Sequence, residues 1–93
     1  MARIDINRSG EMEVFVRVVE SGGFSAAARS LSLTPSAVSK LISRLEKRLG
    51  ARLISRSTRH LQLTPEGREF FERSTAVLAG IEDAERAAGS AVE

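Results

Sequence analysis

The chain has 93 residues, enough for one small domain, and it carries a formal net charge of +2 with 42% hydrophobic residues. It has no cysteine and one histidine, which excludes a disulfide framework, a thiolate metal site and most histidine-based metal or catalytic clusters. We therefore expect no catalytic residues, no metal and no cofactor. No apolar run is long enough to span a bilayer and the N-terminus lacks the apolar core of a signal peptide, so we expect a cytoplasmic protein without a membrane partner.

Charge is strongly segregated along the chain. Residues 66–93 contain seven acids and three arginines, a net charge of −4. Residues 25–60 have a net charge of +7, because a single acid, Glu46, stands against eight cations: Arg29, Lys40, Arg44, Lys47, Arg48, Arg52, Arg56 and Arg59. A dense positive segment is an electrostatic footprint for a polyanion. The acidic segment at 66–93 is not expected to lie along that polyanion.

The first predicted helix lies before the glycine pair at 22–23. Asn7 or Ser9 can cap its start, and Gly22 ends it. Its apolar stripe consists of Met12, Phe15, Val16 and Val19. We expect this helix to close the core beneath the two helices that follow.

Residues 24–49 predict two helices joined by a tight turn. The first covers eight residues, 24–31, and Ala28 on its apolar side permits close packing of the backbones. Thr34 is a good N-cap and Pro35 suits the first position of the second helix, which places the turn at residues 32–35. Such a pair is a helix-turn-helix, with Ser32 where glycine is commoner. We expect the angle between the helices to be filled by Leu33, Val38 and Leu41.

The helix predicted over 35–49 has two contrasting faces. Apolar residues recur at helical spacing on one side, at Val38, Leu41, Ile42, Leu45 and Leu49. The other side carries only hydroxyls and lysines, at Ser36, Ser39, Lys40, Ser43 and Lys47. Small hydroxyls permit close approach to base edges and lysines reach phosphates, so this face suits a DNA groove. The alternative is a solvated amphipathic helix. We expect Glu46 to be a structural partner of a neighbouring arginine.

Two short runs after Gly50 predict a β-hairpin. They cover 52–56 and 60–64 and are separated by the basic, hydroxyl-rich tip at 57–59. Leu53, Leu61 and Leu63 can share one face and seal the core, which leaves the arginines of the tip projecting. The hairpin therefore has the geometry of a wing; the alternative is a solvated basic hairpin.

Thr64 and Pro65 then begin a helix that can continue to about Ala88. Gly67 near its start is expected to permit close packing against the body. Its apolar seam is formed by Phe71, Leu78, Ile81, Ala88 and Val92, with Ser74 and Glu85 as polar interruptions. The seam predicts a homodimer interface, with the alanines favouring close approach but modest apolar area.

Four blocks in order resemble the N-terminal DNA-binding domain of the LysR-type transcriptional regulators. They are FSAAARSL at 24–31, TPSAVSKLISRLE at 34–46, LGARLISR at 49–56 and RHLQLTPEG at 59–67. The resemblance covers nearly the whole chain. It implies a mostly α fold: a winged helix-turn-helix with a three-helix core and a two-stranded wing at 1–64, then a linker and dimerisation helix at 65–93. Ile54 stands where the family often has phenylalanine, which we expect to be a silent core substitution.

The resemblance also implies a bacterial regulator that binds promoter DNA as a dimer at an interrupted palindrome with A·T-rich flanks. Helix 35–49 would enter the major groove with Pro35, Ser36, Ser39, Lys40 and Ser43. The DNA backbone would be contacted by Ser25, Thr34, Lys47 and Arg52, although Ser25 and Thr34 could equally be simple helix caps. The wing at 52–64 would place Arg56 and Arg59 at the minor groove.

Family members normally continue into an effector-binding domain that senses a small molecule, and this domain is absent from the chain. The chain is therefore expected to be a fragment or a naturally short form. A winged-helix protein-interaction module is the alternative function, since fold alone does not settle function. An enzyme is the weakest alternative, because the chain has no cysteine, no histidine pair and no phosphate-cradling glycine loop.

Overall fold

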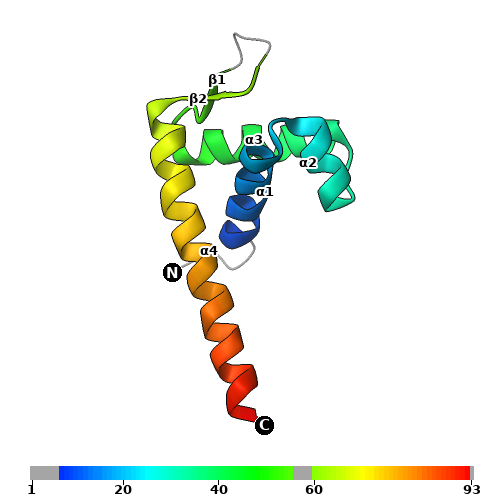
Figure 1. Cartoon of the computed structure of the whole chain (residues 1–93). Coiled ribbons are helices and arrows are strands. Elements are labelled where there is room, and N and C mark those ends of the chain that lie inside the picture. Colours follow the sequence, from blue (N-terminus) through cyan, green and yellow to red (C-terminus); the bar gives the residue numbers. More distant parts are fainter. Residues whose placement is uncertain (1–6, 56–59, 93) are drawn as a thin grey trace.

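A computed structural model describes residues 7–55 and 60–92. The described chain contains α1 (Arg8–Ser21), α2 (Phe24–Leu31), α3 (Pro35–Leu49), β1 (Ile54–Ser55), β2 (Gln62–Leu63) and α4 (Pro65–Val92). Figure 1 shows α3 crossing one end of α1, with α2 at one end of α3 and the strands beside the start of α4. The mostly α winged helix-turn-helix with a long final helix is confirmed.

Local capping explains where the helices begin and end. The Asn7 side chain accepts a hydrogen bond from the Gly10 N–H (2.9 Å), so Asn7 rather than Ser9 is the N-cap of α1. Gly22 ends α1 in the left-handed conformation, with φ of 85°. At α4, the Thr64 Oγ1 accepts from the Gly67 N–H (2.9 Å). The helix continues past the predicted end near Ala88 to Val92.

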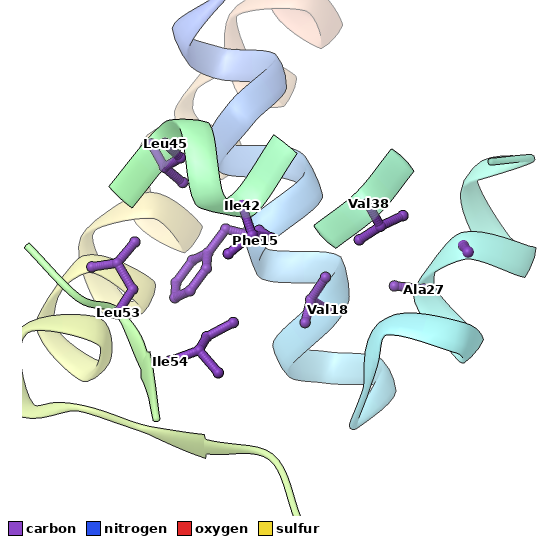
Figure 2. Close-up of a cluster of buried hydrophobic side chains, with 9 residues drawn as sticks. Phe15, Val18, Ala27, Val38, Ile42, Leu45, Leu53 and Ile54 are labelled. Atoms are coloured by element: carbon purple, nitrogen blue, oxygen red, sulfur yellow. The ribbon is translucent and has the colours of Figure 1, made fainter. Parts of the chain in front are cut away.

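The core lies between the three short helices and the base of the hairpin. Figure 2 shows Phe15 of α1 surrounded by side chains from α3 and from the start of β1. The Phe70 ring of α4 packs against Phe15 with centroids 5.4 Å apart. The buried cluster consists of Phe15, Val18, Ala27, Ala28, Val38, Ile42, Leu45, Leu53 and Ile54. Ile54 is 2% exposed, which confirms it as a core residue.

Three predictions about the core were incomplete or wrong. Val18 is fully buried although the predicted stripe of α1 omitted it. Leu33 is 40% exposed and does not fill the angle between α2 and α3, because it follows the turn that ends α2 and its N–H bonds back to the Ala28 carbonyl. Leu49 is 39% exposed because α3 ends there and the chain turns at Gly50, so the core does not cover it.

The wing is a short antiparallel hairpin in which Ile54 pairs with Leu63 and Ser55 with Gln62. Its strands are shorter than the predicted runs at 52–56 and 60–64. Leu53 is buried, while Leu61 and Leu63 are partly buried against the core, as their shared face predicted. The predicted tip at 57–59 lies outside the described residues.

Candidate nucleic-acid interface

The turn between α2 and α3 depends on one serine. Ser32 has φ of 59° and ψ of 41°, and its N–H donates to the carbonyls of Ala28 and Arg29. This is the left-handed helix end at which glycine is most favourable, and serine adopts it here at some conformational cost. Thr34 then caps α3 by accepting from the Ala37 N–H at 3.1 Å. The two helices are thus joined by a turn with both ends capped.

The polar side of α3 lies at the surface. Its apolar side is buried through Val38, Ile42 and Leu45. Ser39 is half-buried, and the remaining predicted groove residues are exposed: Pro35, Ser36, Lys40 and Ser43. Because α3 is held on the core by the opposite side, these side chains are available to a ligand without any change of fold.

A shallow depression lies where α3 meets the base of the wing. It is lined by Ser43, Lys47 and Arg52, three residues predicted to contact DNA, together with Glu46, Gly50 and Ala51. Lys47 and Arg52 are exposed. The two cations and the hydroxyl favour a phosphate group there, and Glu46, the one acidic residue of the lining, is 8% exposed.

Two other arginines of the positive segment, Arg44 and Arg48, lie on the side of α3 that is next to α1. Arg48 donates to the Glu11 carboxylate through its Nε (3.1 Å) and through its terminal nitrogen. Arg44 and Arg48 line a hollow with Leu41 between α1 and α3. Arg48 therefore connects the end of α3 to α1, a role that its position in the sequence did not reveal.

Glu46 is structural, as predicted, but its described partners are backbone groups. The residue is 8% exposed, and its Oε2 accepts from the N–H groups of Leu53 (2.8 Å) and Ile54 (3.1 Å). The sequence offered no signal for this, because the two donors carry no side-chain pattern. These two bonds attach the end of α3 to the base of the wing.

Of the remaining residues predicted to contact DNA, two are described by the structure and two are not. Ser25 is exposed in the first turn of α2, where Gly23 is the N-cap and no side chain caps the helix. Thr34 is exposed, and its hydroxyl is already used as a cap. Arg56 and Arg59 lie outside the described residues.

The long helix α4 has one side on the body and another in solvent. The body side includes Gly67 and Ser74, both buried, and Phe70, Phe71 and Leu78, which are partly buried. Ser74 is fully buried, and its hydroxyl has no hydrogen-bond partner within the described chain. Exposed apolar residues continue the same stripe further along the helix, at Val77, Ile81, Ala84 and Ala88. The predicted seam thus divides: Phe71 packs on its own core, and Ile81 and Ala88 face outward.

Within residues 7–55 and 60–92, no cluster of three or more histidine, cysteine or acidic side chains could hold a metal ion. No helix in that part of the chain is long and apolar enough to cross a membrane.

A helix-turn-helix with a two-stranded wing and an exposed basic, hydroxyl-rich helix defines a winged-helix nucleic-acid-binding domain. The family described as "bacterial regulatory helix-turn-helix protein, lysR family" matches residues 10–68. The chain belongs to the LysR family and is its helix-turn-helix DNA-binding domain.

Curated relatives and solved structures agree with this assignment. The chain is 49% identical over 77 residues, 83% of its length, to the transcriptional regulator CrgA of Neisseria meningitidis, of which it covers 26%. It is 38% identical over 87 residues, 94% of its length, to the probable regulator LtrA of Klebsiella pneumoniae, of which it covers 28%. These relatives are transcriptional regulators, and the chain spans about a quarter of their length.

The similar solved structures include complexes with DNA. The BenM DNA-binding domain with benA site 1 DNA has a TM-score of 0.88 and 28% identity, over 91% of this chain and 96% of that one. The CbnR DNA-binding domain with DNA has a TM-score of 0.82 and 27% identity, over 91% of this chain and 98% of that one. Both matches cover the long final helix as well as the winged domain, because they extend over nine tenths of the chain.

Proposed function

We propose that the chain binds double-stranded promoter DNA sequence-specifically as a homodimer and performs no catalysis. The exposed face of α3 carries this proposal: it is basic and hydroxyl-rich, and the opposite face fixes it to the core. Protein interfaces favour aromatic anchors, and this face has none, which argues against the protein-interaction alternative. The cell compartment that follows from this function is the bacterial cytoplasm, where chromosomal DNA lies.

Base recognition is assigned to α3 in the major groove. Ser36, Ser39 and Ser43 would offer short hydroxyls to base edges, and Lys40 would reach a guanine or a phosphate from the same side. Pro35 starts the helix with a preset backbone angle and leaves no N–H to satisfy. The N-terminal half of the helix would therefore make the closest approach to the bases.

Backbone contacts are assigned to both ends of the helix-turn-helix. Lys47 and Arg52 share the depression beside the wing, so one phosphate could interact with both. Ser25 and Thr34 lie at the starts of α2 and α3, where helix dipoles favour an anion. These contacts would set the position of α3 without reading bases.

The wing, residues 52–64, is assigned to the flanks of each half-site. The described base of the hairpin is anchored on the core at Leu53 and Ile54. Arg56 and Arg59 would enter a narrow A·T-rich minor groove, where negative potential is concentrated. Their assignment depends on the sequence and on the family resemblance.

Dimerisation is assigned to α4, residues 65–93, with residues 1–64 as the DNA-binding unit. Figure 1 shows the second half of α4 extending away from the other helices. Ile81, which is 38% exposed, and Ala88 would meet the partner helix, with Phe71 and Leu78 at the junction with the body. Two copies would present two α3 helices to an interrupted palindrome with A·T-rich flanks. In a complete regulator, an effector-binding domain beyond this chain would bind the small molecule.

Salt dependence of DNA binding tests the proposal. Each phosphate that is neutralised contributes about −0.9 to the slope of log K against log salt concentration. We expect a steep negative slope, and Lys47→Ala should reduce its magnitude by about 1 per bound chain. Arg73→Ala is the matched control, because this exposed arginine pairs with Glu69 on α4 and should leave the slope unchanged. A wild-type slope near zero would refute the proposal.

A further inference from the structure

One buried carboxylate joins the recognition helix to the base of the wing. Glu46 lies one turn before the end of α3, and its Oε2 accepts from two consecutive N–H groups, those of Leu53 and Ile54. Both donor residues are almost completely buried. Charged acceptors make stronger hydrogen bonds than neutral ones, and the surrounding burial strengthens them further. The entry of the chain into β1 is therefore tied directly to α3.

The same short segment is held from its other side by Thr64, the residue that precedes α4. The Leu53 carbonyl accepts from the Thr64 N–H at 3.0 Å, and the Thr64 hydroxyl lies 2.5 Å from the Arg52 carbonyl. Ile54 pairs with Leu63 across the hairpin. In the part of the hairpin that the structure describes, each strand is two residues long, so the base of the wing has few ladder bonds of its own. Its direction relative to α3 is consequently set by the groups that hold residues 52–54.

We infer that Glu46 is a positioning residue that sets the wing relative to α3 and thereby determines preference for the DNA flanking each half-site. This rests on the proposed function, in which α3 reads the major groove and the wing reads the flanks. A buried, negatively charged side chain is poorly suited to touch DNA itself, and its effect would pass through the backbone of Leu53 and Ile54. Both grooves can be engaged at once only if the angle between α3 and the wing matches the duplex.

Two conservative substitutions separate the hydrogen bonds from the charge. Glu46→Gln removes the charge but retains an oxygen at the same reach, so it can still accept from both N–H groups. Glu46→Asp retains the charge but is one methylene shorter, so its carboxylate no longer reaches the same position. If hydrogen bonding positions the wing, the aspartate variant is defective and the glutamine variant is not. If the charge matters, the order is reversed.

The readout is discrimination between flanks, measured at one salt concentration with two duplexes. Both carry the half-sites that the wild type selects from random DNA, and one has its A·T-rich flanks replaced by G·C pairs. We expect wild type and Glu46→Gln to prefer the A·T-flanked duplex by about tenfold or more, and Glu46→Asp to lose most of that preference while binding the other duplex as wild type does. The inference is overturned if Glu46→Asp keeps the preference, if Glu46→Gln alone loses it, or if both duplexes are weakened equally.

Failure of the inference and failure of the proposed function give different results. A wild type that prefers no duplex over random DNA would refute the proposed function, and the inference with it. If the wild type prefers the A·T-flanked duplex and Glu46→Asp has the same preference, the inference is refuted but the proposed function is not. Should Glu46→Asp fail to fold, amide hydrogen exchange decides. The Leu53 and Ile54 N–H groups should be protected from exchange in both wild type and Glu46→Gln, and rapid exchange of both groups in the wild type would overturn the inference.

Discussion

At Gly67 the start of α4 lies directly on the backbone of Leu53. A Cβ added at this glycine would meet the Leu53 carbonyl oxygen at 2.0 Å, a distance that only a backbone shift could relieve. The residue is buried in the first turn of α4. The absence of a side chain at this position therefore determines how closely α4 approaches the wing.

We predict that Gly67→Ala destabilises the domain by about 1–3 kcal/mol, because forcing an extra methyl group into a packed contact displaces backbone. Gly80→Ala is the matched control, since nothing lies within 4 Å of a Cβ added there. Gly80→Ala should instead stabilise the domain by about 0.5–1 kcal/mol, because alanine has a higher helix propensity than glycine. Urea denaturation of both variants measures the difference, and equal effects of the same sign would contradict this packing account.

Single residues differed in how far the sequence could predict them. The close packing at Gly67 and the capping by Thr34 were predictable, because glycine and threonine are used at such positions for local reasons. The bonds of Glu46 and Arg48 were not, because each joins residues that are distant in sequence or has backbone partners. Contacts of this kind depend on how the elements meet, which a helical period does not specify.

At the scale of elements, α3 combines two kinds of polar residue that should respond differently to substitution. We predict that Ser36→Ala relaxes base preference and costs about 1–3 kcal/mol on the preferred site. The same result is expected for Ser39→Ala. Lys47→Ala should weaken binding to all duplexes alike, because it contacts phosphate. Competition assays with preferred and scrambled duplexes measure this, and a uniform loss from all three changes would contradict the division of roles.

The exposed apolar residues of α4 lead to a prediction about the homodimer. Ile81→Glu should raise the dimer dissociation constant by about tenfold or more, because the partner helix would have to bury an unpaired charge. Ala79→Glu introduces the same charge about 200° around the helix and should leave the dimer intact. Sedimentation equilibrium distinguishes the two, and an unchanged dimer in Ile81→Glu would place the interface elsewhere.

Helices were the most predictable elements, because caps and apolar spacing are local. The predicted helices at 24–31 and 35–49 match α2 and α3 residue for residue. The sides of α4 were less predictable, because one apolar stripe serves both its own body and solvent. Phe71 and Ile81 are ten residues apart on that stripe, but only Phe71 packs on the core described here.

At the scale of the whole molecule, one long helix determines the greatest dimension, and charge is divided between the elements. The principal extents are 50 × 33 × 23 Å, and the 28 residues of α4 alone account for about 42 Å at 1.5 Å per residue. The positive segment at 25–60 includes all of α3, while the net negative segment at 66–93 falls on α4. The net positive and the net negative segment therefore fall on different elements of the molecule.

The central claim is that a pair of these chains reads a specific duplex, and selection from a random pool of double-stranded DNA tests it most directly. Selection at low and near-physiological salt should enrich an interrupted palindrome with A·T-rich flanks, with half-sites about one helical turn or a multiple of it apart. Recovery of bound DNA without any enriched sequence, or no bound DNA at either salt concentration, would contradict the claim.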